Sequence, residues 1–133
     1  MAKPSPNTPC PCGGGKYKKC CQKYHKGAFA PSALLLMKSR YSAYALDIAE
    51  YIIRTTHPDN PDYTENTQRW REEISRFSQG TRFEGLRILS YEEGEEESFV
   101  SFEATLSSGI MREKSRFLKE NGRWLYVDGV VSF

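Results

Sequence analysis

The chain has 133 residues, of which 38% are hydrophobic and 13% are aromatic. This is enough for one ordinary domain with its own core plus a small appendage, and it excludes two large independent domains. The longest apolar run, Ala33 to Met37, is far shorter than the roughly 20 residues that span a bilayer. The first nine residues lack the apolar region of a signal peptide. We therefore expect a soluble, cytoplasmic protein without a membrane partner.

Charge is distributed unevenly along the chain, although the net charge is only +2. Residues 1–26 hold six lysines and no acidic residue, so this segment carries +6. The remaining 107 residues hold 13 basic and 17 acidic residues and carry −4. This asymmetry indicates that the two parts of the chain meet different partners.

All four cysteines lie within twelve residues, at Cys10, Cys12, Cys20 and Cys21. In a reducing compartment, clustered cysteines are more often metal ligands than disulfides, and adjacent cysteines would close only a strained ring. Zinc prefers four soft ligands in a tetrahedron, and the glycines at 13–15 allow the chain to reverse between the two cysteine pairs. Four protein ligands leave no open coordination position. The pattern therefore predicts one structural, rather than catalytic, zinc ion.

Other uses of these cysteines stay open from the residues alone. One alternative is that the four thiols are structural and bind no metal. A second is a redox dithiol, although such sites normally contain a C-x-x-C pair. A third is an iron–sulfur cluster, although the usual cysteine spacings of such clusters differ from these. His25 follows Cys21 by four residues and would lie on the same face of a helix, so it could replace Cys21 as the fourth ligand. In most such cases the histidine is simply solvated.

The cysteine segment resembles the SEC-C motif, a short zinc-binding module found at the C-terminus of the SecA preprotein translocase motor and in many bacterial proteins. The residues that carry the resemblance are Cys10, Cys12, Gly13, Gly15, Lys16, Tyr17, Lys18, Cys20 and Cys21. Seven residues separate the second and third cysteines, one fewer than in the usual module. Because the missing residue falls beside glycines, we expect all four ligands to be kept. Met1 to Pro9, with three prolines, is expected to be a mobile lead-in.

Helical periodicity begins after a linker-like passage over residues 26–31. Ser32 is a suitable N-cap for a first helix, in which Met37, Tyr41 and Tyr44 recur on one face. That stripe predicts a face that packs into the core.

Two further helical pieces are expected. Asp47, followed by Glu50, is typical of a new N-cap, and the piece that starts there should stop at His57-Pro58. After a loop, a third helix is predicted from Thr67 to Ser78, with Gly80 past its end. The apolar residues at helical spacing in this third helix are Trp70, Ile74 and Phe77.

From Phe83 onward the apolar period changes to two, which indicates strands. The predicted strands are 83–91, 100–106, 110–120 and 123–131. Asn121-Gly122 is the strongest short-range hairpin signal in the chain. With a two-residue turn there, the register places Lys119 opposite Trp124, Phe117 opposite Tyr126 and Ser115 opposite Asp128.

Helices followed by an antiparallel sheet of about four strands indicate an α+β fold. This region resembles the middle domain of the bacterial YchJ family, which implies a nuclear transport factor 2-like cone with about three helices packed on a curved sheet. The matching segments are residues 36–41, 51–58, 99–104 and 115–129. We therefore expect a zinc-binding module with its lead-in over residues 1–30 and an NTF2-like domain over residues 31–133. Family members often carry a second SEC-C motif at the C-terminus, and this chain has none up to Phe133.

The second domain contains no complete catalytic motif, and we assign no catalytic residue. Cones of this kind enclose a pocket, and related enzymes use an Asp/His or Asp/Tyr pair there. The candidates here are His57, Asp128, Glu113 and Arg116. Each also has a structural interpretation: a helix end for His57, a turn for Asp128, and solvated or cross-strand ion pairs for Glu113 and Arg116. The acidic run at 92–97 is expected to be a solvated turn.

The sequence favours a non-enzymatic interaction protein. Zinc would fold a small basic module that presents its side chains to an acidic partner. The residues expected on that surface are Lys16, Tyr17, Lys18, Lys19, Lys23 and Tyr24. In SecA the similar module contacts an acidic export chaperone and the ribosome, so the resemblance implies a protein or ribosomal partner. Nucleic acid is a narrower possibility, since tyrosines among lysines can stack on bases. The alternative is a small-molecule-binding protein or enzyme that uses the cone pocket.

Overall fold

A computed structural model of the protein describes residues 7–132. The elements in chain order are the 3-10 helix η1 (Tyr17–Lys19), α1 (Gln22–His25), α2 (Ala33–Ala45), α3 (Ala49–Arg54), α4 (Thr67–Gln79), β1 (Phe83–Glu92), β2 (Glu97–Leu106), β3 (Gly109–Glu120) and β4 (Arg123–Ser132). Of the mobile lead-in expected over residues 1–9, residues 1–6 lie outside the described residues. The end of this segment is packed against the module, because Pro9 forms a β-bridge with Lys16 and the Thr8 carbonyl accepts from the Tyr17 N–H.

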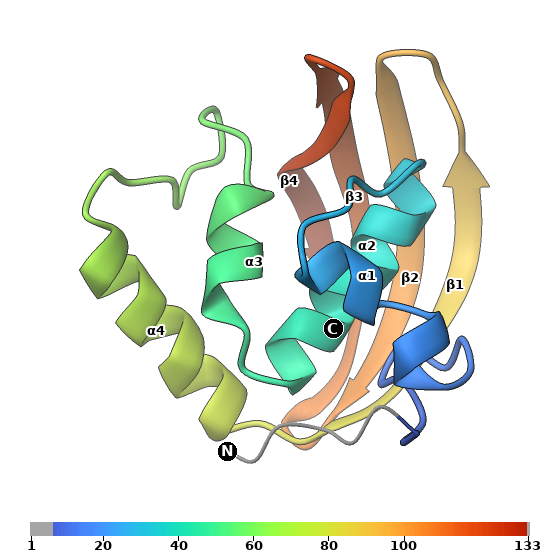
Figure 1. Cartoon of the computed structure of the whole chain (residues 1–133), viewed down its shortest axis with the longest axis vertical. Helices are drawn as coiled ribbons and strands as arrows, with labels where there is room; N and C mark the ends of the chain where they lie inside the picture. The colour runs from blue at the N-terminus through green and yellow to red at the C-terminus, as the bar shows by residue number, and fades with distance from the viewer. Residues whose placement is uncertain (1–6, 133) are drawn as a thin grey trace.

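The four strands form one antiparallel sheet in the order β1-β2-β3-β4, and the helices cover one of its faces (Figure 1). The predicted α+β architecture is therefore confirmed. In β2 the residues with period two point toward the helices and are buried, while their neighbours are partly exposed. These buried residues are Ser98, Val100, Phe102, Ala104 and Leu106. No helix in the described part of the chain is long and apolar enough to cross a membrane.

The predicted hairpin between β3 and β4 is present, with positive φ at both Asn121 (52°) and Gly122 (80°). Both central residues of the tightest hairpin turn need this left-handed conformation, which asparagine and glycine tolerate best. The register next to the turn is as predicted, with Lys119 opposite Trp124 and Phe117 opposite Tyr126.

Farther from this turn the predicted register is wrong. Ser115 lies opposite Gly129 rather than Asp128, because the ladder shifts between Arg116 and Phe117. A bulge of this kind inserts one residue into one strand and moves every later pair by one. Arg116 therefore lies opposite Asp128.

Helix α2 lies at the centre of the molecule and is buried on two sides. Ser32 caps it as predicted, since the Ser32 hydroxyl accepts from the Leu35 N–H. The predicted stripe of Met37, Tyr41 and Tyr44 faces the sheet, and all three line a cavity. The opposite side carries Ser39 and Ser42, whose side chains are fully buried. That second side faces the cysteine segment.

The start of α3 differs from the prediction. Asp47 has a positive φ of 58° and lies outside the helix, so it terminates α2 rather than capping the next helix. Ile48 is the N-cap residue of α3, and no side chain caps it. The carboxylate of Asp47 instead accepts from Gln79 at the end of α4. Helix α4 runs one residue beyond the predicted end, to Gln79, and Asn66 caps its start.

The cysteine segment and the α+β domain share one buried cluster. Cys10, Tyr17 and Cys21 belong to the same cluster of buried residues as Leu36 and Ile52. Hydrogen bonds also cross the boundary, because Arg54 donates to two backbone carbonyls of α1. Figure 1 shows η1 and α1 lying against the helical side of the molecule, next to α2. The domain boundary at residue 30 stays a prediction. The segments on its two sides are packed tightly against each other.

Candidate functional site

The four cysteine sulfurs converge at one point. One ligand atom from each of Cys10, Cys12, Cys20 and Cys21 lies within 4.8 Å of all the others. Four of the six sulfur–sulfur distances lie between 3.4 Å, for Cys12 and Cys20, and 3.8 Å, for Cys20 and Cys21. A tetrahedron of sulfurs about 2.3 Å from a central zinc has edges of about 3.8 Å. The cysteines are therefore positioned to bind one metal ion of that size.

Local backbone structure brings the two cysteine pairs together. The Cys10 N–H donates to the Gly15 carbonyl at 2.7 Å, and Gly13 N–H donates to the Cys10 carbonyl at 2.9 Å. Gly13 and Gly15 both have positive φ, which glycine adopts without strain. Gly14 is needed for space, because a Cβ there would lie 2.8 Å from the Cys20 sulfur. The tight loop predicted between the pairs is thus built from all three glycines.

The thiols influence one another strongly because they are close and mostly buried. Hydrogen bonds from Cys12 and Cys21 lower the pKa of Cys10 far below its ordinary value. Burial, together with the hydrogen bonds to the Cys12 and Cys10 sulfurs, raises the pKa of Cys20 to about 12. The hydrogen bond to Cys10 is the main cause that raises the pKa of Cys21. A bound dication would supply the positive charge that stabilises all four sulfurs as thiolates.

His25 does not take the place of Cys21. Its Nδ1 accepts from the Tyr17 hydroxyl at 2.6 Å, and its Nε2 lies 2.8 Å from the Ser39 carbonyl oxygen. A carbonyl can only accept, so Nε2 carries the hydrogen and both ring nitrogens are engaged. Burial lowers the pKa of His25, which keeps the ring neutral. The alternative ligand set with His25 is therefore wrong, and so is the expectation that this histidine is solvated.

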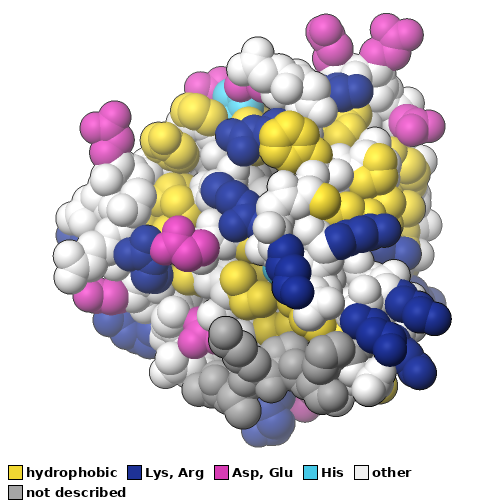
Figure 2. Space-filling view, in the orientation of Figure 1, with side chains coloured by type: hydrophobic (Ala, Val, Ile, Leu, Met, Phe, Trp, Pro, Cys, Tyr) yellow, Lys and Arg dark blue, Asp and Glu magenta, His cyan; other side chains and the backbone are white. Residues whose placement is uncertain are grey.

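The surface of this segment is basic, but it is not aromatic. Lys16, Lys18, Lys19 and Lys23 are exposed, and Figure 2 shows Lys and Arg side chains gathered over η1 and α1. Two tyrosines that the sequence placed on this surface are buried, with Tyr17 5% and Tyr24 6% exposed. They pack beneath the lysines because their rings fill the space between the cysteine loop and α2 and α3. The expectation that they meet a partner directly is therefore wrong.

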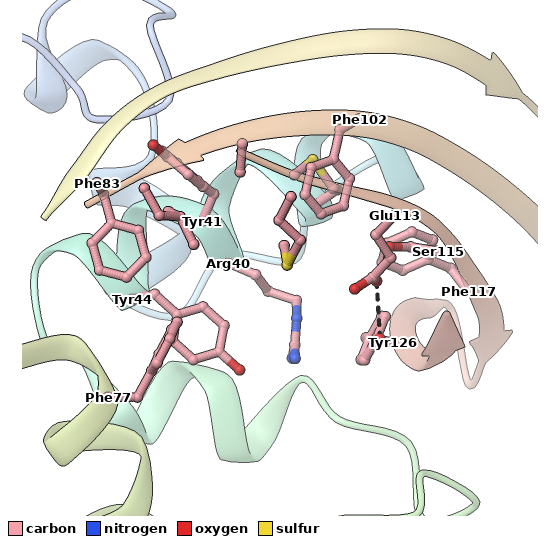
Figure 3. Close-up of a pocket in the computed structure, with 14 residues that line it drawn as sticks. Arg40, Tyr41, Tyr44, Phe77, Phe83, Phe102, Glu113, Ser115, Phe117 and Tyr126 are labelled. Carbon is pink, nitrogen blue, oxygen red and sulfur yellow. Dashed lines mark hydrogen bonds between the residues drawn. The ribbon is translucent and has the colours of Figure 1, made fainter. Parts of the chain in front are cut away.

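A second candidate site lies between α2 and the sheet. It is a cavity of about 240 Å³, and most of its wall is aromatic or aliphatic. Its charged residues are Arg40 and Glu113, and hydroxyl groups come from Tyr41, Tyr44, Ser115 and Tyr126. Figure 3 shows Arg40 extending from α2 into this space between Tyr44 and Tyr126, with Glu113 hydrogen-bonded to Tyr126.

The candidate acid–base residues do not converge. His57 lies outside the cavity, where its Nε2 donates to Glu120 at 2.8 Å and its Nδ1 accepts from the Asp59 N–H. Asp128 is not a turn residue. It lies in β4 and forms two hydrogen bonds of 3.1 and 2.9 Å with Arg116, which lower the pKa of Asp128. Arg116 thus forms the expected cross-strand ion pair.

Glu113 is the one acidic candidate that lines the cavity, and the expectation that it belongs to a solvated or cross-strand ion pair is wrong. Ser115 and Tyr126 both donate hydroxyl hydrogens to its Oε2. Arg40, which is not among the residues expected in the cavity, also lines it. A signal for it was present, because Arg40 is a charged residue inside the apolar stripe of Met37, Tyr41 and Tyr44. A charge on a core face of a helix indicates a buried polar site.

Comparison with known proteins identifies the family. The family model for the YchJ middle NTF2-like domain matches residues 32–129. The chain belongs to the YchJ family. A UPF0225 protein of Pectobacterium carotovorum is 38% identical over 95% of this chain and 84% of its own length. A UPF0225 protein of Streptomyces coelicolor is 39% identical over 93% of this chain and 96% of its own length.

Among solved structures, a SEC-C motif containing protein from Rhodopseudomonas palustris superposes with a TM-score of 0.80. It is 31% identical to this chain, and the match covers 95% of this chain and all of the other. The YchJ-family chain is thus a SEC-C protein, with the cysteine module and the NTF2-like domain both covered by the comparison. The bacterial origin of these relatives agrees with the resemblance found in the sequence.

Proposed function

We propose that this YchJ-family protein binds one structural zinc ion through Cys10, Cys12, Cys20 and Cys21. The observation that carries this is the convergence of the four sulfurs at the spacing of a tetrathiolate zinc site. Zinc fits better than harder metals, because all four donors are soft thiolates. With four protein ligands the metal has no open position, so its role is to hold the segment in shape.

Native mass spectrometry of the full chain tests the metal. We expect one zinc per chain, and none in the double variant Cys10→Ser with Cys12→Ser. A matched control is Ser101→Ala with Ser107→Ala, which leaves the cysteines unchanged. Iron or no metal in the native protein, with zinc failing to bind on addition, would refute the zinc site.

We further propose that the zinc-held segment binds an acidic protein or a ribosomal partner through its lysines. Lys16, Lys18 and Lys19 are exposed and follow one another around the metal-binding loop. The sum of the zinc dication and four thiolates is −2, so the segment keeps a positive charge. Clustered positive charge of this kind steers association with acidic surfaces and gives it a steep dependence on salt. The analogy with the SecA module points to the same kind of partner.

Ribosome co-sedimentation and capture of acidic proteins test this surface. The test variant reverses three charges, Lys16→Glu, Lys18→Glu and Lys19→Glu. The control changes net charge equally on exposed residues outside the module, with Arg69→Glu, Arg76→Glu and Arg82→Glu. We expect only the lysine variant to lose binding. Equal loss in both variants would reduce the effect to net charge and would contradict a specific basic surface.

Nucleic acid is the weaker of the proposed partners. Tyr17 and Tyr24 are buried, so they are not available to stack on bases. Binding of arbitrary single-stranded RNA that weakens steeply with salt would favour nucleic acid over an acidic protein.

A further inference from the structure

The cavity beneath α2 has the walls of a binding site for a small aromatic molecule. Rings from helices and strands surround it (Figure 3), and those of Tyr41, Phe83, Phe77 and Tyr44 meet edge to face in a connected series. Phe83 contacts both Tyr41 and Phe77 in this way, with ring centroids 5.7 Å apart in each pair. Its volume of about 240 Å³ is just below the roughly 300 Å³ at which sites for drug-sized ligands begin. A ligand with one ring and short substituents suits this size.

Arg40 brings a positive charge to this apolar space. Its side chain is only 7% exposed, and it forms no ion pair with a carboxylate in residues 7–132. Nη1 is held in place by three acceptors, the Ile52 carbonyl and the hydroxyls of Thr55 and Thr56, at 2.8 to 3.2 Å. The guanidinium also lies 4.7 Å from the centre of the Tyr126 ring. A buried, oriented guanidinium without a counter-charge is suited to bind a carboxylate.

Glu113 supplies the second polar feature of the cavity. Its Oε2 accepts from two hydroxyls, whereas Oε1 has no hydrogen bond within the described residues. Like Arg40, Glu113 forms no ion pair in that part of the chain. Gly129, which pairs with Ser115 on the neighbouring strand, leaves room for this carboxylate, because a Cβ at position 129 would collide with it. Glu113 is therefore held at the cavity wall with one oxygen free to accept a hydrogen bond.

We propose that this cavity binds a small aromatic carboxylate that also carries a hydrogen-bond donor. The ring packs among the aromatic walls, the carboxylate pairs with Arg40, and the donor meets Oε1 of Glu113. The ligand then gives Arg40 a counter-charge and gives Oε1 of Glu113 a hydrogen-bond donor.

Four small molecules separate the parts of this proposal. They are 4-hydroxyphenylacetate, with carboxylate and donor; phenylacetate, with the carboxylate alone; p-cresol, with the donor alone; and tyramine, with a cation in place of the carboxylate. Titration calorimetry of the full chain gives their affinities. The methyl signals of Met37 and Met111, which line the cavity, report entry of a ring through ring-current shifts. We expect 4-hydroxyphenylacetate to bind best and tyramine worst.

Variants assign these effects to residues. Glu113→Gln should weaken 4-hydroxyphenylacetate at least severalfold and leave phenylacetate unchanged, while Arg40→Gln should weaken both acids about tenfold or more. Because Arg40 also supports the fold, Ala104→Leu gives a second test. Ala104 is 1% exposed and lines the cavity, so the larger side chain fills it and should abolish all binding. Glu95→Gln in the exposed turn is the matched control.

Two results would overturn the proposal. One is that p-cresol or tyramine binds as tightly as the acids, since Arg40 would then play no part in recognition. The other is that no compound shifts the two methionine methyls at millimolar concentration. Either result leaves the zinc site untouched, because the two sites are tested by different measurements.

Discussion

The Nε2 atom of His25 donates a hydrogen bond to the carbonyl oxygen of Ser39 across 2.8 Å, and this bond joins the cysteine module to the central helix. The same imidazole accepts from Tyr17 and packs edge to face on Tyr51, with ring centroids 4.8 Å apart. One side chain thus connects three parts of the molecule.

We expect His25→Ala to lower the free energy of unfolding by about 1–3 kcal/mol, because buried polar groups lose their partners. Urea denaturation of the zinc-loaded protein measures this. Lys26→Ala, an exposed neighbour, serves as control and should change stability by no more than about 0.5 kcal/mol. An equally small effect of both substitutions would show that the bond to Ser39 is unimportant.

Removal of the metal should weaken the whole protein without unfolding it. Cys10 and Cys21 belong to the shared core, and the Cys10 sulfur lies 3.3 Å from the Ser42 hydroxyl of α2. The sheet and the larger helices nevertheless have their own apolar contacts. We expect a chelator to lower the melting temperature by roughly 5–10 °C, and far-UV circular dichroism at room temperature to stay largely native. Added zinc should restore the transition, and an unchanged melting temperature would mean that the module is energetically independent.

Substitution of Gly14 should disturb the metal site through a direct collision. A Cβ at this position would lie 2.8 Å from the Cys20 sulfur and 3.3 Å from the Cys12 sulfur. We expect Gly14→Ala to weaken zinc binding about tenfold or more and to change the visible spectrum of the cobalt-substituted protein. Gly85→Ala is the control, because a Cβ at Gly85 would meet no atom closer than the Thr105 Cβ at 4.0 Å. Identical cobalt spectra for the two variants would contradict this explanation.

The titration of His25 should be shifted toward acid. Burial lowers its pKa below the ordinary value of 6.5, and the hydrogen bond to Ser39 opposes this only in part. The unfolded chain then takes up a proton at this residue more readily than the folded chain. Its contribution to stability is therefore present above about pH 6.5 and is lost as the pH falls through the lowered pKa.

Nuclear magnetic resonance of the imidazole carbons, assigned with His25→Gln, follows this titration directly. The midpoint in the native protein should lie below that in the urea-unfolded protein. A native midpoint at or above 6.5 would be inconsistent with the buried, neutral ring.

Sequence patterns predicted the elements well because periodicity and turn chemistry are local. Asn121-Gly122 identified the hairpin, and the alternation through β2 identified the face that packs on the helices. What failed depends on contacts between distant residues. The bulge after Arg116 is invisible in the period of β3, and it alone moves Ser115 from Asp128 to Gly129.

The candidate site was predictable to the same extent. The cysteine spacing gave four residues that the fold brings together, since they are close in sequence and joined by glycines. The burial of Tyr17 and His25 was not predictable, because it depends on the position of α2 relative to the cysteine segment. Likewise, Glu113 lines the cavity only because the face of β3 that carries it is turned toward α2.

The covered position of the cysteines limits how this module can be used outside its own protein. Cys10 and Cys21 are 3% and 2% exposed, and α2 provides part of that cover. If residues 7–30 were transplanted as a metal-binding tag, their thiols and the rings of Tyr17 and Tyr24 would face water. A graft that keeps its metal must therefore carry α2 with it, which makes residues 7–45 the smallest unit worth transferring.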